Sequence, residues 1–160
     1  MLAFDASSII YAWDNYPEKQ FPPLWKWISD NVENGEFVMA NIAFDEVKNK
    51  APDCAKFLKD AGLTQIKINN AIAQEAIRIK ARLGITNDEY HPDGVGENDI
   101  LIIATAKIQN MELVTEEGRQ AKQPRENRRL KIPRVCGLPD VGVKSLNFIE
   151  LIRRSNEVFK

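Results

Sequence analysis

The sequence predicts an α/β fold with a central, mostly parallel sheet, and two patterns lead to this prediction. Short apolar runs typical of buried strands alternate with longer stretches in which apolar residues recur at helical spacing. Glycine, proline and asparagine residues separate these stretches. Strands separated by helices favour a parallel sheet flanked by helices. The length of 160 residues is that of one domain with a sizeable core.

Before residue 85, predicted strands and helices alternate. The strands cover residues 1–4, 36–40 and 64–68, which are short runs that are apolar or alternate apolar and polar residues. The helices lie around the apolar positions of residues 9–13, 24–32, 44–47, 53–61 and 72–83. Polar residues just before three of these helices are expected to cap them, namely Ser7 or Ser8, Asn41, and Asn69 or Asn70.

After residue 85, a polar loop leads into the most apolar helix of the chain. Residues 85–96 are polar and contain glycine, and residues 99–106 are apolar on nearly every side, which predicts a helix that is buried all round. Residues 112–115 are predicted to form a strand, as are Val135 and its neighbours, and residues 146–158 a closing helix.

Composition and charge exclude several classes of protein. A net charge of −1 gives the whole chain no strong attraction to nucleic acid, so any such attraction must come from a local patch. The single histidine, His91, excludes sites that need two histidines and removes the usual base of a Ser-His-Asp site. Cys54 and Cys136 match no metal-ligand spacing and are expected to be reduced cysteines of a cytoplasmic protein. Asp5 interrupts the stretch in which a signal peptide would be apolar, and no membrane span is expected.

Acidic residues are expected to meet at one edge of the sheet, because ligands of parallel α/β sheets gather beyond the carboxyl ends of the strands. Asp5 ends the first strand. Glu116 and Glu117 follow directly after the strand predicted at residues 112–115. Asp99 begins the buried helix, and Glu46 lies on the helix after the second strand. Four regions of the chain are therefore expected to bring carboxylates to one place.

Carboxylates packed together repel one another, and a divalent cation among them removes that cost. Oxygen-only ligands suit Mg²⁺ or Mn²⁺, and the lack of a histidine pair or a cysteine pair disfavours zinc. Taken singly, each acid has an ordinary explanation as a turn residue, a helix-start acid or a solvated surface residue. The hypothesis of a metal site therefore depends on all four regions together.

These residues resemble the motifs of the PIN-domain (PIN-like) ribonuclease family, and more closely its subfamily of VapC-type toxins. Four stretches resemble those that carry the acids of the family, namely residues 4–10, 42–47, 98–106 and 113–117. Residues 131–136 and 146–150 resemble the last strand and helix of the subfamily. The resemblance spans nearly the whole chain, and residues 99–106 are its most specific part.

The resemblance implies one nuclease domain, residues 1–160, with a three-layer α/β/α fold. It also implies an Mg²⁺- or Mn²⁺-dependent endoribonuclease that is the toxin of a toxin–antitoxin pair. In this interpretation Asp5 and Asp99 bind the metal directly, and the number of ions, one or two, is left open. Glu46 and Glu117 complete the ligand shell or position the attacking water, and Thr115 holds a carboxylate by a hydrogen bond.

The sequence departs from the family at the closing acid, which is glutamate here where aspartate is commoner. Three neighbouring acids remain alternatives, because Glu116 competes with Glu117, Asp45 with Glu46 and Glu97 with Asp99. Glu117 is preferred to Glu116 since it stands two residues after Thr115, as in the family.

A basic run follows the closing acid directly. Residues 119–134 are the densest basic stretch of the chain, and four side chains in it are expected to contact RNA phosphates, namely Lys122, Arg125, Arg128 and Arg129. A solvated surface loop and a binding site for an acidic antitoxin peptide remain alternatives. The family and the aromatic residues near the amino terminus are also compatible with a homodimer.

Individual residues also suggest two other functions. A non-catalytic module that binds RNA or a partner would explain the unusual glutamate at position 117. A phosphatase of the haloacid-dehalogenase kind also begins with a strand-end aspartate, but it needs a second aspartate two residues later, where this chain has Ser7. The nuclease is therefore the leading hypothesis.

Overall fold

The computed structural model describes residues 1–160 and contains one five-stranded sheet. The strands are β1 (Leu2–Phe4), β2 (Phe37–Ala40), β3 (Thr64–Ile66), β4 (Glu112–Val114) and β5 (Ser145–Leu146). Their order is β3-β2-β1-β4-β5, and each neighbouring pair is parallel. The predicted α/β class is confirmed, and the sheet is wholly parallel.

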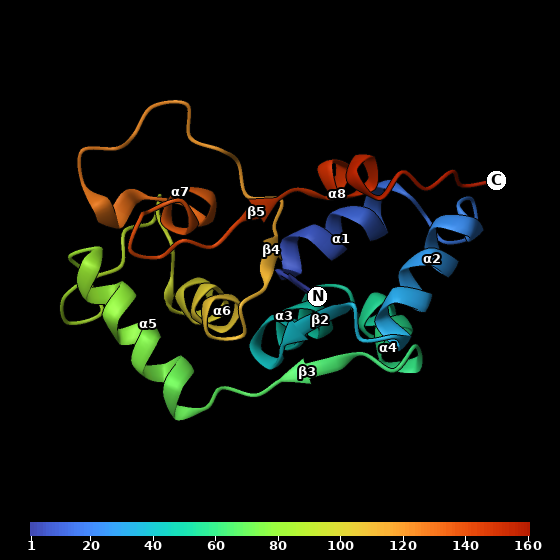
Figure 1. The fold of residues 1–160 in the computed structure, drawn as a ribbon, viewed down its shortest axis with the longest axis horizontal. Helices are drawn as coiled ribbons and strands as arrows, with labels where there is room; N and C mark the ends of the chain where they lie inside the picture. The colour runs from blue at the N-terminus through green and yellow to red at the C-terminus, as the bar shows by residue number, and fades with distance from the viewer.

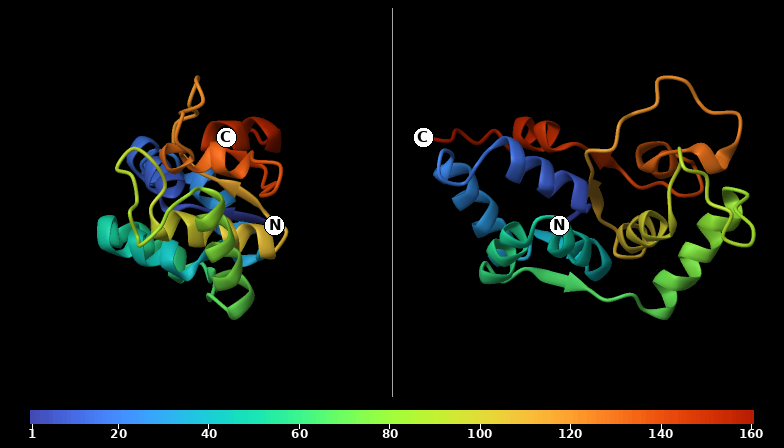
Figure 2. Two further views of the ribbon diagram at one scale, coloured as in Figure 1. Left: turned by 90° about the vertical axis from the view of Figure 1, so that its left-hand side faces the viewer. Right: turned by 180° about the vertical axis from the view of Figure 1, so that it is seen from behind.

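Helices cover both faces of this sheet and make it the middle of three layers. They are α1 (Ala6–Asn15), α2 (Pro22–Glu33), α3 (Asn41–Lys50), α4 (Pro52–Asp60), α5 (Asn70–Arg82), α6 (Glu97–Ile108), α7 (Ile132–Cys136) and α8 (Phe148–Ser155). Figure 1 shows α5, α6 and α7 on one side of the strands and α1, α2 and α8 on the other, and Figure 2 shows the same layers from two further directions. This division follows from the strand order, since right-handed crossovers place helices on opposite faces when the direction of progress along the sheet reverses.

Helix α6 contains more buried residues than any other helix, in line with its apolar sequence. Ile103, Ala104 and Ala106 have no exposed surface, and Ile100 and Ile102 are 2% exposed. The helix packs between α5 and β4, so apolar side chains are needed on nearly every side. This burial fixes the amino end of α6, where Asp99 lies, relative to the sheet.

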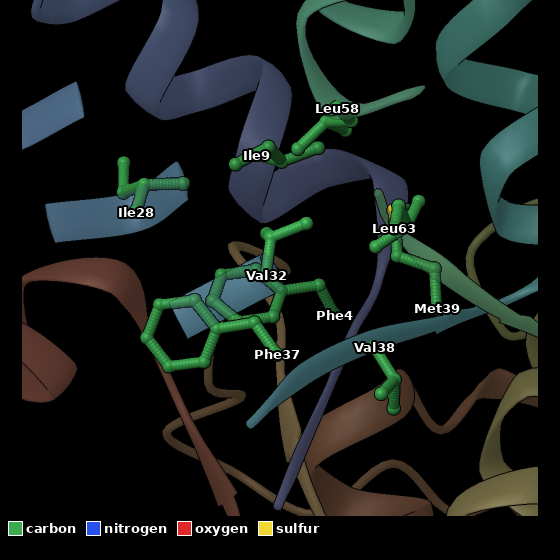
Figure 3. A pocket seen from close by; sticks show the side chains of 9 residues that line it. All are labelled: Phe4, Ile9, Ile28, Val32, Phe37, Val38, Met39, Leu58 and Leu63. Atoms are coloured by element: carbon green, nitrogen blue, oxygen red, sulfur yellow. The ribbon is translucent and has the colours of Figure 1, made fainter. Parts of the chain in front are cut away.

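The opposite face of the sheet rests on a second apolar layer. Figure 3 shows nine apolar side chains from β1, β2, α1, α2, α4 and the turn before β3 around a small gap. The gap measures about 10 Å³, which is room for about one water molecule, so it is a packing defect and not a ligand site. Trp25 belongs to the same side and packs against Trp13 and Phe57, which supports the interpretation of Trp25 as a core residue.

The carboxyl-terminal region differs from the prediction. Residues 132–136 form helix α7 and not a strand, because Pro133 stands in the first turn of a helix, where its fixed φ angle is favourable. The last strand is β5, at Ser145–Leu146, which overlaps the first residue of the stretch predicted to be the closing helix. The closing helix itself begins after Asn147, whose side chain accepts a hydrogen bond from the backbone N–H of Glu150 at 2.8 Å.

Two of the three predicted caps are also wrong. Neither Ser7 nor Ser8 caps α1, and Asn41 is the first residue of α3 without capping it. Asn69 caps α5 as predicted, because its Oδ1 accepts from the backbone N–H of Ile72 at 2.9 Å. None of the helices combines the length and the apolar character that crossing a bilayer requires.

Candidate functional site

Asp5 lies at the carboxyl edge of the sheet, where two central strands end side by side. Phe4 pairs with Val114 across β1 and β4, and the backbone N–H of Asp5 donates to the carbonyl of Val114 at 2.8 Å. The residue after Val114 is Thr115, so the parallel register places Asp5 beside it. The sheet-edge rule therefore predicted the position of Asp5 correctly.

Two hydroxyl groups hold the side chain of Asp5. Ser7 Oγ donates to Asp5 Oδ2 at 2.7 Å, and Thr115 Oγ1 donates to the same oxygen at 3.0 Å. Burial raises the pKa of Asp5, which is 4% exposed, and the negative charges of Asp99 and Glu46 raise it further. Asp5 is thus oriented by its neighbours and electrostatically coupled to two of the predicted acids.

Asp99 stands in the first turn of α6 and faces the same edge. Its Oδ2 accepts from the backbone N–H of Gly96 at 2.9 Å. Burial raises the pKa of Asp99, and the negative charges of Glu117 and Glu46 raise it further. Glu97, the competing acid, is exposed and makes no hydrogen bond or ion pair through its side chain, so the structure favours Asp99 as the cluster member.

The structure separates Glu117 from Glu116. Glu117 Oε2 accepts from the backbone N–H of Ile132 at 3.0 Å, burial raises its pKa, and Asp5 and Glu46 add to that rise. Glu116 instead turns to the start of α8, where its Oε1 accepts from the backbone N–H of Phe148 at 2.6 Å. Glu117 is therefore the acid that meets the other three.

Glu46 reaches the same place from α3. Its charge adds to the raised pKa of Asp5, of Asp99 and of Glu117, so it lies within electrostatic range of all three. Its Oε1 accepts from Lys50 Nζ at 2.7 Å, one helical turn further on. Asp45 is exposed and makes no such contact, so Glu46 is the member of this pair that belongs to the cluster.

The four carboxylates, called the acidic cluster below, share a pattern of hydrogen bonding. Each has one oxygen that accepts from the protein and a second oxygen that accepts nothing from it; the free oxygens are Asp5 Oδ1, Glu46 Oε2, Asp99 Oδ1 and Glu117 Oε1. No fully buried polar atom lacks a partner, so these free oxygens all reach solvent. Half of each carboxylate is thus anchored and the other half is available to a ligand.

The donor set fits a hard divalent cation. Four carboxylates offer only oxygen, as Mg²⁺ and Mn²⁺ prefer. Cys136 lies near Asp5 and Glu117, but burial raises the pKa of its thiol to about 12, so it is no thiolate ligand. In this structure no three of these side chains form a ready-made metal-binding group.

Both cysteines are free, as predicted, and both are buried. His91 makes its side-chain contact outside the acidic cluster. The Nδ1 of His91 accepts from the backbone N–H of Asp93 within the 85–96 loop.

The basic run is a loop whose two ends are fixed at the acidic cluster. We call residues 119–134 the basic segment; it contains a short 3₁₀ turn, η1 (Asn127–Arg129), and leads into α7. The bond from the N–H of Ile132 to Glu117 joins the two sides of the loop. Gln120 braces it, since its Nε2 donates to the carbonyl of Arg129 and its Oε1 accepts from the N–H of Lys131. Figure 1 and Figure 2 show this loop, in orange, projecting from the body of the molecule.

The charges of this segment divide into paired and unpaired groups. Arg128 pairs with Glu126 at 2.7 Å and Arg119 with Glu150 at 2.9 Å. The side chains of Lys122, Arg125 and Arg129 are exposed and make neither ion pairs nor hydrogen bonds within the protein. Three of the four predicted phosphate contacts therefore have free charges, whereas Arg128 is partly neutralised.

Sequence reasoning missed Ser7, Lys50 and Gln120 as parts of this site. Ser7 was considered only as a helix cap, yet it donates to Asp5 and accepts from the N–H of Glu116 at 3.0 Å. The spacing of four residues between Glu46 and Lys50 was a usable signal for an ion pair on a helix. No local signal predicts Gln120, because its partners come from the far end of a loop.

Comparison with known proteins gives a family for this chain. Residues 2–159 match the family described as a domain of unknown function, DUF4411. The chain belongs to this family. No curated protein matches the sequence.

Three solved structures are similar to this DUF4411 member. One is a chain of VapBC2 from Rickettsia felis bound to a DNA fragment from their promoter, at 17% identity and a TM-score of 0.54, covering 92% of this chain and 98% of that chain. A toxin–antitoxin complex from Klebsiella pneumoniae (17% identity, TM-score 0.48, covering 73% of this chain and 87% of that chain) also matches. PAE2754 from Pyrobaculum aerophilum matches with 16% identity, a TM-score of 0.48, and coverage of 96% of this chain and 94% of that chain.

The VapBC2 match extends over nearly all of both chains, so the two share a fold. The resemblance to the VapC-type PIN-like family is therefore confirmed at the level of the fold, as is the three-layer α/β/α architecture.

Proposed function

We propose that this DUF4411 protein is a metal-dependent endoribonuclease and the toxin of a toxin–antitoxin pair. The observation that carries the proposal is the acidic cluster, in which carboxylates come from four distant regions of the chain and each keep one oxygen free. Burial and the charges of neighbouring carboxylates raise the pKa values of Asp5, Asp99 and Glu117. Repulsion and desolvation of such carboxylates destabilise a folded protein, and a bound divalent cation would offset that cost.

The residues of the cluster have distinct roles in this proposal. Asp5 and Asp99 offer their free oxygens as direct ligands to Mg²⁺ or Mn²⁺, and Glu46 and Glu117 complete the ligand shell or accept a hydrogen bond from the attacking water. Thr115 and Ser7 keep Asp5 in one orientation through its other oxygen. When bound, the metal supplies an activated water and positive charge opposite the leaving oxygen of the phosphodiester.

The basic segment binds the substrate in this proposal. Lys122, Arg125 and Arg129 hold the phosphates that flank the scissile bond, because their charges are not neutralised within the protein. An acidic antitoxin peptide is the partner we propose for the same surface, which would block RNA. The VapBC2 complex from Rickettsia felis, which shares this fold, supports a toxin–antitoxin pair.

A non-catalytic binding module is the second candidate. Its support is the glutamate at position 117 together with the lack of a ready-made group of three metal ligands. This candidate predicts that RNA binds in the presence of EDTA and that no product ever forms.

The deciding experiment incubates purified protein with RNA in Mn²⁺, in Mg²⁺ and in EDTA. We expect cleavage by the wild type in one or both metals, none in EDTA, and none by Asp5→Asn in any condition. Equal amounts of intact RNA with wild type and Asp5→Asn under every metal would reject the nuclease. RNA binding that survives EDTA would then support the binding module.

A further inference from the structure

A lysine contacts one carboxylate of the acidic cluster and lies within electrostatic range of two others. Lys50 is the last residue of α3, and its Nζ donates to Glu46 Oε1 at 2.7 Å. This hydrogen bond raises the pKa of Lys50, and the negative charges of Asp5 and Asp99 raise it further. Conversely, the charge of Lys50 opposes the rise in the pKa of Asp99. One ammonium group therefore acts on three members of the cluster.

We infer that Lys50 is a built-in counter-ion that neutralises part of the acidic cluster without metal and competes with the divalent cation for Glu46. The inference rests on the proposed function, because it takes the cluster to be a metal site. It adds to the proposed function that Lys50 helps to determine the affinity of the site for the metal.

The competition follows from charge and from access. An ammonium on Glu46 occupies one of its oxygens, and its positive charge repels a dication placed among the same carboxylates. The Lys50 side chain is 63% exposed, so it leaves Glu46 for water at little cost when a cation arrives. Lys50 thus weakens metal binding without preventing it.

Helix α3 supplies a matched control. Lys48 stands two residues earlier on the same helix, is exposed and makes no ion pair or hydrogen bond through its side chain. Lys48→Met removes the same charge from the same helix but from outside the cluster. Lys50→Met keeps the length of the side chain, and Lys50→Arg keeps the charge.

The test is a calorimetric titration of metal-stripped, full-length protein with Mn²⁺. We expect Lys50→Met to bind Mn²⁺ about threefold more tightly than the wild type, and Lys48→Met and Lys50→Arg to bind it as the wild type does. In EDTA, Lys50→Met should melt at a lower temperature than Lys48→Met, because its cluster has lost a counter-ion. Opposite changes in metal affinity and metal-free stability distinguish this role from general damage to the fold.

Two results overturn the inference in different ways. If the wild type binds Mn²⁺ and Lys50→Met binds it equally or more weakly, Lys50 is not a competitor, although the nuclease proposal stands. If the wild type binds no Mn²⁺ and cleaves no RNA, the competition and the proposed function fail together.

Discussion

The acidic cluster and the basic segment meet at one edge of the sheet but are built in opposite ways. The acids come from four elements of the fold, are at least partly buried, and are each held by one oxygen. The basic residues come from one continuous loop; Arg119 and Arg128 are paired with acids and Arg134 donates to the carbonyl of Gln120, whereas the others are exposed and free. The fold thus fixes the acids in place, whereas the bases remain adjustable.

In the proposed nuclease, this difference assigns catalysis to the acidic cluster and RNA affinity to the basic segment. Fixed carboxylates with free oxygens suit a reaction that needs exact positions, and a charged loop suits a polymer whose phosphates vary in position. Changes in the cluster are therefore expected to act on the rate of cleavage, and changes in the segment on the binding of RNA.

The largest effect is expected at Asp99, with Glu97 as its matched control. Asp99→Asn removes a proposed metal ligand and should lower the rate of RNA cleavage about a thousandfold, which corresponds to roughly 4 kcal/mol of transition-state stabilisation. Glu97→Gln, two residues earlier and exposed, should cleave at the wild-type rate. Single-turnover cleavage in Mn²⁺ measures both, and equal rates in the two variants would place the ligand elsewhere.

A smaller effect is expected at Glu117, for which Glu116 is the control. Glu117→Gln should lower the cleavage rate about a hundredfold, since we propose that this acid completes the ligand shell. Glu116→Gln should leave the rate unchanged and lower the free energy of unfolding by about 1 kcal/mol, because a charged acceptor of the Phe148 N–H is lost. If the two variants exchange these phenotypes, Glu116 is the fourth acid.

The basic segment should change affinity more than rate. Replacing Lys122, Arg125 and Arg129 together by alanine should weaken RNA binding about tenfold or more at moderate salt and reduce its salt dependence. Arg128→Ala should have a smaller effect, since Glu126 already neutralises Arg128. Fluorescence anisotropy with labelled RNA, measured on the Asp5→Asn background, gives affinity without cleavage. An unchanged salt dependence in the triple variant would mean that this segment is an ordinary surface loop.

The smallest effect is on the stability of the metal-free protein as the pH changes. Burial raises the pKa of Asp5, Asp99 and Glu117, so the folded chain holds protons that the unfolded chain has released. Their contribution to stability is complete below the ordinary pKa of about 4 and is lost as the pH rises through the raised values. In EDTA the free energy of unfolding should therefore fall as the pH rises above about 4, and it should fall less in Asp5→Asn. The same slope in both proteins would contradict the coupling.

The sequence was sufficient for the architecture and for the meeting place of the acids. Alternating strands and helices define a parallel sheet, and a parallel sheet sends residues that follow its strands to one edge, so Asp5 and Glu117 were predicted to meet although they lie far apart in the chain. The apolar character of α6 predicted its burial, which in turn positions Asp99.

Tertiary contacts explain what the sequence did not reveal. The run Ile-Pro-Arg-Val-Cys at 132–136 is short and apolar, as a strand would be, but the proline and packing against α6 make it a helix. From the sequence alone, Ser7 resembles a helix cap. In the fold, the parallel register places Thr115 beside Asp5, and the hydroxyls of Ser7 and Thr115 both donate to Asp5. The bracing of the basic segment by Gln120 depends on a loop closure that no local pattern encodes.

The most direct test of the central claim is anomalous diffraction from crystals of the protein grown with Mn²⁺. We predict a manganese peak between the carboxylates of Asp5 and Asp99, with their free oxygens drawn toward it and Lys50 released from Glu46. A protein that crystallises in excess Mn²⁺ with no peak there, and with the cluster unchanged, would contradict the account.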